Sequence, residues 1–204
     1  MSALLVFLHV AVKQRAFQGE LESALGGISV TAVGRIGDFD RALKEGQDAV
    51  LSLPVVLTAR GLAPRLRGQR GGVTEERYAL VGVDKSPDPM AVGAVGALDL
   101  LGRDGTNGFV HGLLGAKPKV ERVTKVEDLL PLLQMQRVDA IVLPARQFLE
   151  IKASSRLNLA QRELPQAVGL PAVANTGAQA AQVSAAIGKL PASLSKAIGV
   201  DGWR

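Results

Sequence analysis

The sequence predicts an α/β fold in which two similar α/β lobes are joined by crossing strands. Short apolar segments alternate with amphipathic ones along the 204 residues, which is typical of a mainly parallel sheet covered by helices. Residues 38–54 (DFDRALKEGQDAVLSLP) and 126–144 (VEDLLPLLQMQRVDAIVLP) also share one plan: an acidic residue opens a helix, and Asp-Ala leads an apolar strand that ends at a proline. This repeat predicts two related lobes, with the ordinary recurrence of such units in α/β proteins as the alternative.

The first part of the chain contains strands and helices in alternation. Gly26-Gly27 closes the first helix, Asp38 is expected to cap the second, and Pro54 ends the third strand. The Gly- and Arg-rich stretch 61–76 is expected to be a loop. The expected strands are 4–12, 28–33, 49–53 and 78–83, and the expected helices are 16–25 and the short one that begins at Asp38.

The second part of the chain repeats the alternation. The expected strands are 91–101, 119–123 and 138–143, the helices are 107–114 and 127–135, the extended segments are 157–164 and 168–174, and the tail from 179 is helical. We expect the chain to cross between lobes near 81–83 and 168–174. The first lobe is then 1–82 with 167–204, and the second is 83–166.

Composition limits the classes of function. Hydrophobic residues make up 47% of the chain, which is enough for a packed core, and there is no cysteine for thiol catalysis, disulfides or cysteine-bound zinc. The net charge is +5. The arginines at 60, 65, 67 and 70 are expected in a solvated loop, with attraction to an anion or a membrane surface as the alternative. Nucleic-acid binding is not expected, because no aromatic side chains stand among these arginines to stack on bases. The apolar N-terminal segment is interpreted as a buried strand rather than a signal peptide. If the protein is exported, its signal has already been removed.

Four segments carry a resemblance to a known family. They are RYALVGVDKSPDP (77–89), VTKVEDLLPLLQMQRVDAIVLP (123–144), AVGLPAVANTGAQAAQVSAAIGKL (167–190) and AIGVDGW (197–203). Together they resemble the type II periplasmic-binding-protein fold, and more narrowly the phosphate/phosphonate-type substrate-binding proteins of ABC transporters. The resemblance implies a monomer, periplasmic or an extracytoplasmic lipoprotein, that binds a small phosphate- or phosphonate-like molecule and delivers it to a membrane permease or sensor. A cytoplasmic location is the alternative.

The candidate ligand-binding residues follow from strand ends. Ligands of open α/β sheets bind beyond the carboxyl ends of the strands. Thr106 and Asn107 are expected at the first helical positions after a glycine turn, where free N–H groups and the helix dipole favour an anion. Asp104 either caps this helix or joins the site. The other candidates are Arg35 and Arg146, as counter-charges to an anion, and Gln14 and Ser52, at strand ends.

Catalytic and metal-binding patterns are weak in this chain. His9 and His111 are its only histidines, and both are expected to be structural. Asp48 and Asp139 begin strands at equivalent places and are expected to bond local backbone rather than to act as paired acids. The glycine spacing between 102 and 115 matches no nucleotide-binding motif. We therefore predict a non-enzymatic binding protein without metal, cofactor or nucleic-acid partner; the alternatives are an enzyme on the same fold (phosphoribosyltransferase, dehydratase or menaquinone-pathway type) and the effector-binding module of a regulator.

Overall fold

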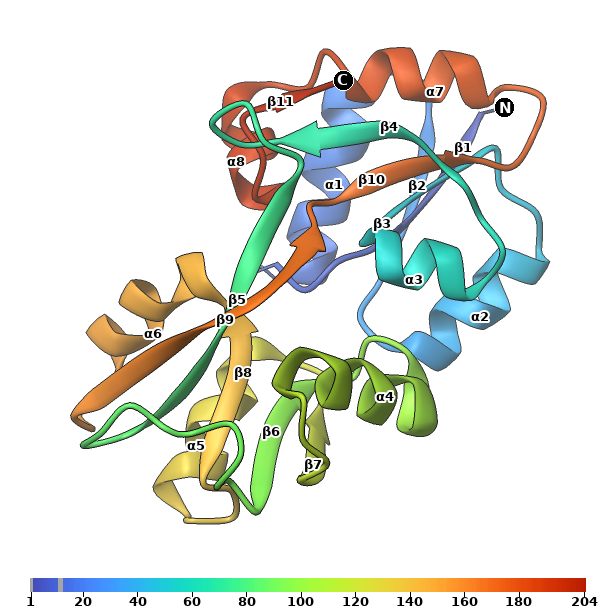
Figure 1. Cartoon of the computed structure of the whole chain (residues 1–204). Coiled ribbons are helices and arrows are strands. Elements are labelled where there is room, and N and C mark those ends of the chain that lie inside the picture. The colour runs from blue at the N-terminus through green and yellow to red at the C-terminus, as the bar shows by residue number, and fades with distance from the viewer. Residues whose placement is uncertain (1, 11–12) are drawn as a thin grey trace. The chain divides into compact units, whose positions relative to one another are not determined.

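The chain forms two compact α/β units. The computed structural model describes residues 2–10 and 13–204 (Figure 1). Unit 1 comprises Met1–Glu75 with Gly169–Arg204, and unit 2 comprises Glu76–Val168. The chain leaves unit 1 through strand β5 (Glu75–Val83) and returns through β9 (Leu159–Gly169). The predicted class, two α/β lobes joined by crossing strands, is confirmed.

Unit 1 is built on a six-stranded sheet with the order β11-β4-β10-β3-β1-β2. Strand β1 is parallel to β2 and β3, whereas β10 is antiparallel to β3 and β4. The strands are β1 (Ala3–Phe7), β2 (Ser29–Val33), β3 (Ala49–Ser52), β4 (Pro64–Gln69), β10 (Ala172–Asn175) and β11 (Gly202–Trp203).

Helices cover the sheet of unit 1 because each presents an apolar stripe to it. In α1 the residues Phe17, Leu21 and Leu25 recur every four positions and are buried in one core cluster with residues of β1 and β2. In α2 the ring of Phe39 packs on Phe7, with 5.2 Å between ring centroids. The helices are α1 (Gln14–Leu25), α2 (Ile36–Lys44), α3 (Pro54–Ala59), α7 (Ala180–Ile187) and α8 (Ala192–Ile198).

Unit 2 has a five-stranded sheet with the order β7-β6-β8-β5-β9. Strand β6 is parallel to β7 and β8, and β5 is antiparallel to β8. Two apolar clusters form its core, one around Leu80 and Val110 and the other around Leu129 and Ile141. The remaining elements are β6 (Ala94–Leu98), β7 (Lys119–Val123), β8 (Ala140–Pro144), α4 (Gly102–Leu114), η1 (Val126–Asp128), α5 (Leu129–Gln134), η2 (Ala145–Gln147) and α6 (Phe148–Ser154).

The two units follow the same plan, as the sequence repeat predicted. In each, one strand (β1 or β6) lies between two parallel neighbours, a long helix follows it, and an antiparallel strand (β10 or β5) extends the sheet. Asp48 and Asp139, which stand at equivalent positions of the two units, both accept hydrogen bonds from backbone N–H groups. The carboxylate of Asp48 accepts from the Ala3 N–H (3.0 Å), and that of Asp139 accepts from the N–H groups of Gly93 and Ala94 (2.8 and 2.9 Å). Each carboxylate therefore holds the amino end of the adjacent strand, and the expected backbone-bonding role is confirmed.

Four expectations about local structure were wrong. Asp38 does not cap the second helix, because α2 begins at Ile36 and Asp38 lies in its first turn. The stretch 61–76 contains strand β4, in which Arg65 and Arg67 point to solvent while Leu66 and Gly68 face inward. Helix α4 begins at Gly102 rather than at Asn107, because a glycine with φ +78° provides the turn. His9 follows β1 instead of lying within it; the end of the predicted strand at residues 11–12 lies outside the described residues.

Candidate functional site

The start of α4 is held by a hydrogen-bonded network at the carboxyl end of β6. The hydroxyl of Thr106 donates to Asp99 Oδ1 (2.9 Å) and accepts from the Leu101 N–H (3.0 Å). Thr106 is fully buried, and its hydroxyl finds both of its partners inside the protein. Arg122 of β7 donates to the other oxygen, Asp99 Oδ2, at 2.7 Å. The network links the residue after β6, strand β7 and the first turns of α4.

The first turn of α4 exposes unpaired backbone N–H groups. The first N–H groups of an α-helix have no partner inside the helix. In α4, whose N-cap is Leu101, the Leu101 N–H donates to Thr106, so the N–H groups left without such a partner belong to residues 102–104. Arg103, Asp104 and Gly105 of this turn are exposed. A Cβ at position 105 would lie 2.6 Å from the Leu101 Cβ, so only glycine lets the preceding chain fold back this closely. The turn thus combines unpaired donors and the positive end of the helix dipole, which favour an anion, with one guanidinium (Arg103) and one carboxylate (Asp104).

Arg146 follows β8, the strand parallel to β6, and is already paired. Its Nε donates to Glu76 Oε2 at 2.8 Å, and the two side chains are 26% and 12% exposed. Tyr78 is buried beside them, and its burial, followed by the charge of Glu76, raises the pKa of the phenol above its usual range. In this structure the charge of Arg146 is therefore paired with Glu76 within unit 2 and is not free to bind a ligand.

The three candidates of unit 1 lie at the carboxyl ends of its parallel strands. Ser52 ends β3; it is fully buried and its hydroxyl donates to the Phe7 carbonyl at 2.8 Å. Gln14 begins α1; its Nε2 donates to the Ala32 carbonyl and its side chain lies against Gly34. Arg35 follows β2 and its side chain is exposed. Gln14 is thus brought beside the turn that carries Arg35.

The structure refines the chemistry available at each predicted position. Asp104, Thr106 and Asn107 lie together in the first two turns of α4, but the unpaired N–H groups belong to residues 102–104. The hydroxyls of Ser52 and Thr106 are satisfied inside the protein, while the side-chain oxygen of Asn107 is buried without a hydrogen-bond partner. Whether these residues bind a ligand stays a prediction. Sequence reasoning missed Asp99 and Arg122, which lie 23 positions apart and meet only when β6 and β7 pair.

The remaining polar candidates are structural. His111 Nε2 lies 3.0 Å from the carbonyl oxygen of Pro118 and so ties α4 to the segment before β7, as predicted. Within residues 2–10 and 13–204, no cluster of three or more His, Asp or Glu residues could hold a metal ion. No helix among these residues is long and apolar enough to cross a membrane.

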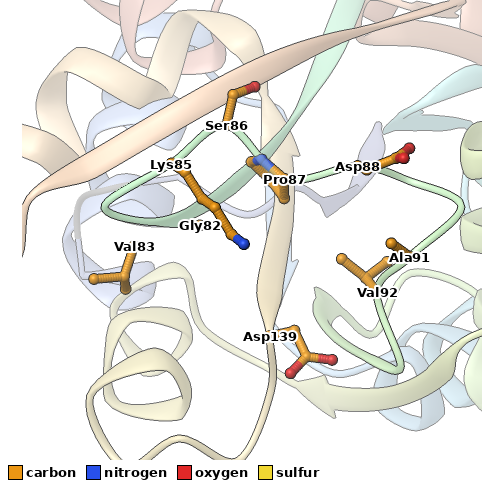
Figure 2. A pocket seen from close by; sticks show the side chains of 9 residues that line it. All are labelled: Gly82, Val83, Lys85, Ser86, Pro87, Asp88, Ala91, Val92 and Asp139. Carbon is orange, nitrogen blue, oxygen red and sulfur yellow. The ribbon is translucent and has the colours of Figure 1, made fainter.

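A pocket of about 360 Å³ lies in unit 2, away from the strand ends described above. It is formed by the end of β5, the segment between β5 and β6, and Asp139 at the start of β8 (Figure 2). The carboxylate of Asp139 already accepts two backbone N–H groups there. Its lining residues are Gly82, Val83, Lys85, Ser86, Pro87, Asp88, Ala91, Val92 and Asp139.

Comparison with known proteins identifies the fold. No family model and no curated protein match the sequence. Among solved structures, XAC2383 from Xanthomonas citri, with ATP bound, is similar at TM-score 0.66 and 12% identity over 100% of this chain and 91% of that one. The GluR0 ligand-binding core from Nostoc punctiforme, in complex with L-glutamate, gives 0.62 and 9% over 92% and 91%. The VFT2 domain of Bordetella pertussis BvgS gives 0.62 and 14% over 97% and 91%. The fold is that of two-lobe, type II periplasmic-binding-protein-like domains.

Proposed function

We propose that this protein is a binding protein, not an enzyme, and that it takes up a small polar anion at the carboxyl ends of its strands. The first turn of α4 carries the proposal. Its bare N–H groups stand next to the exposed Arg103, and the network of Asp99, Thr106 and Arg122 holds them in place. Donors fixed in advance bind an anion without losing further conformational freedom.

Charge and structural similarity support an anionic ligand. The chain carries a net charge of +5, which attracts anions to its surface. XAC2383 has been solved with ATP and with a chloride ion, and the GluR0 core with L-glutamate, so some proteins of this fold bind anions, while ArgBP from T. maritima has been solved with arginine. A phosphate- or phosphonate-like molecule is the narrower proposal for this chain.

The predicted residues receive distinct roles in this proposal. Thr106 positions the start of α4, and Asn107 offers its unpaired oxygen to a donor group of the ligand. Arg35 supplies an exposed guanidinium after β2, in the turn against which Gln14 lies, and Ser52 supplies a buried hydroxyl at the end of β3. Arg146 contributes only if it parts from Glu76.

The proposal extends to motion, location and partners. Ligand binding closes the protein by bending at the two connections between units, with lobe boundaries near residues 82 and 167. The protein acts as a periplasmic or extracytoplasmic monomer that presents the closed form to a membrane permease or sensor. Small-angle scattering tests this part: addition of a bound anion should reduce the radius of gyration, and an unchanged profile contradicts closure.

Binding measurements test the site. Native mass spectrometry of the freshly purified protein, followed by calorimetry with inorganic phosphate, methylphosphonate, ATP and L-glutamate, identifies the anion class. The Arg103→Ala variant should bind about tenfold more weakly, the effect of one charge-assisted hydrogen bond. Arg156→Ala is the matched control, because Arg156 is an exposed arginine of the same unit that follows α6. Both variants should melt like the parent protein.

Three results contradict the proposal. The first is that none of the four anions binds. The second is that Arg103→Ala and Arg156→Ala weaken binding equally, which indicates general charge attraction rather than a site at α4. The third is turnover of a bound anion, which favours the enzyme alternative.

A further inference from the structure

Strand β2 forms one edge of the unit 1 sheet, and β11 forms the other. One side of β2 pairs with β1, and the Ser29 N–H donates to the Ser2 carbonyl as that pairing begins. In a parallel ladder alternate residues point their N–H and C=O groups to opposite sides, so Val30 and Ala32 direct theirs away from the sheet. Such an edge is a template onto which another strand adds.

Side chains of α1 occupy this edge. Glu22 Oε1 accepts from the Val30 N–H and Gln18 Oε1 accepts from the Ala32 N–H, both at 3.1 Å. Gln14 Nε2 donates to the Ala32 carbonyl. Three outward backbone groups of β2 are therefore hydrogen-bonded to one helix, which packs along the strand (Figure 1). We name the residues Gln14, Gln18 and Glu22 the edge ladder.

The spacing of the edge ladder matches the repeat of the strand. Its members stand at positions i, i+4 and i+8 of α1, so they lie on one helix face about 6 Å apart. Equivalent backbone groups of a strand recur every two residues, about 6.6 Å. Phe17 and Leu21, each next to an edge-ladder residue in sequence, bury the adjacent face of α1 in the core and fix the distance to β2.

We propose that the edge ladder blocks a second copy of this chain from adding to β2. The segment 28–33 (ISVTAV) has no charge and no proline, and four of its six residues are β-branched, so it is prone to pair with itself. Edge strands are usually protected by a charged side chain, a proline or a bulge. Strand β2 pairs regularly with β1 over all five residues and has none of these, so the protection comes from α1. Two copies would meet through the same strand around a two-fold axis.

The double variant Gln18→Ala/Glu22→Ala tests the proposal. It removes both acceptors while leaving Gln14, which belongs to the proposed binding site, in place. The matched control is Glu20→Ala/Ser23→Ala, which removes one carboxylate and one polar group from exposed positions of the same helix. Light scattering after size-exclusion chromatography should show the edge variant shifting with concentration from 21.3 kDa toward twice that mass or larger, while the control stays at the parent's mass.

Hydrogen exchange of the unmodified protein gives an independent measurement that does not depend on how the variant folds. The amides of Val30 and Ala32 should exchange as slowly as those of Ser29 and Thr31, and about tenfold faster in the edge variant as one hydrogen bond each is lost. The variant Glu22→Gln, which keeps an acceptor oxygen, should behave like the parent. Fast exchange at Val30 and Ala32 in the parent protein, or an edge variant that stays at the parent's mass at all concentrations, overturns the proposal.

Discussion

Helices α1 and α4 occupy equivalent positions in the two units but make different contacts with their sheets. Each follows the strand that lies between two parallel neighbours (β1 or β6) and packs against an edge strand of its sheet (β2 or β7). Among the described residues, α1 gives three side-chain hydrogen bonds to β2, whereas α4 gives one to the segment before β7, from His111 to Pro118.

The difference lies in side-chain length and in glycine. Helix α1 has Gln and Glu at its edge-facing positions, whose long side chains reach the neighbouring backbone. Helix α4 has Asn107 one turn before His111, and its oxygen finds no partner. It also has glycine at 102, 105, 108 and 112, and the two in its first turn, Gly102 and Gly105, place no side chain over the helix start. One helix therefore protects a sheet edge, and the other exposes its N-terminus.

The largest expected effect comes from the two strand-holding aspartates. Asp48 is half-buried and uses both oxygens, since Oδ2 accepts from Ala3 and Oδ1 accepts from the Gln179 N–H before α7 (2.9 Å). Asp139 is exposed and uses one oxygen for two neighbouring N–H groups. We expect Asp48→Ala to lower the free energy of unfolding by about 2–3 kcal/mol, and Asp139→Ala by about 1 kcal/mol.

Urea unfolding followed by circular dichroism measures both losses. Asp48→Asn is the control, because an amide keeps one acceptor oxygen and should recover about half of the loss. Equal effects of the two alanine variants would contradict the claim that Asp48 joins more of its unit than Asp139 does.

A smaller loss of stability is expected at alkaline pH, and it should arise from Tyr78 in unit 2. Tyr78 is the only tyrosine of the chain, and its pKa in the folded protein lies above the ordinary value because the phenol is buried next to Glu76. A raised pKa means that the folded state holds its proton more tightly than the unfolded state does. The stability it contributes is complete below the unfolded pKa near 10 and declines above it, by about 1.4 kcal/mol per pH unit, until the folded pKa is reached.

Tyr78 and Trp203 allow the two units to be monitored independently. Tyrosinate absorbance reports Tyr78 in unit 2, and fluorescence reports Trp203, the only tryptophan, in unit 1. Tyr78→Phe should remove part of the alkaline loss of stability without changing the behaviour at neutral pH. A phenol that ionises at its ordinary pKa while circular dichroism still shows the folded protein is the contrary result.

Sequence patterns predicted the features that depend on neighbours in the chain. Alternating apolar runs and the Asp-Ala repeat predicted the paired sheets and the task of Asp48 and Asp139, because these bonds recur at fixed positions in each unit. Strand β4 was missed because its arginines suggested a loop, although Arg-Leu-Arg-Gly alternates like an edge-exposed strand.

Features that depend on contacts distant in sequence could not be read from patterns. The bond between Asp99 and Arg122 requires β6 and β7 to pair in register, and the pairing of Arg146 with Glu76 spans 70 positions. The burial of Thr106 follows from where α4 begins, which a single glycine conformation determines. Site residues were thus placed on the right elements, while their partners came from tertiary packing.

The smallest expected effect comes from making α4 more like α1. Asn107→Gln adds one methylene on the helix face that carries His111, which extends the amide toward β7 as Gln18 extends toward β2. One new hydrogen bond should raise the free energy of unfolding by about 0.5–1 kcal/mol. Gln18→Asn is the reciprocal variant and should lose a similar amount, because the shorter side chain no longer reaches the Ala32 N–H. If Asn107→Gln instead lowers both stability and anion affinity, the Asn107 oxygen serves the ligand rather than the sheet edge.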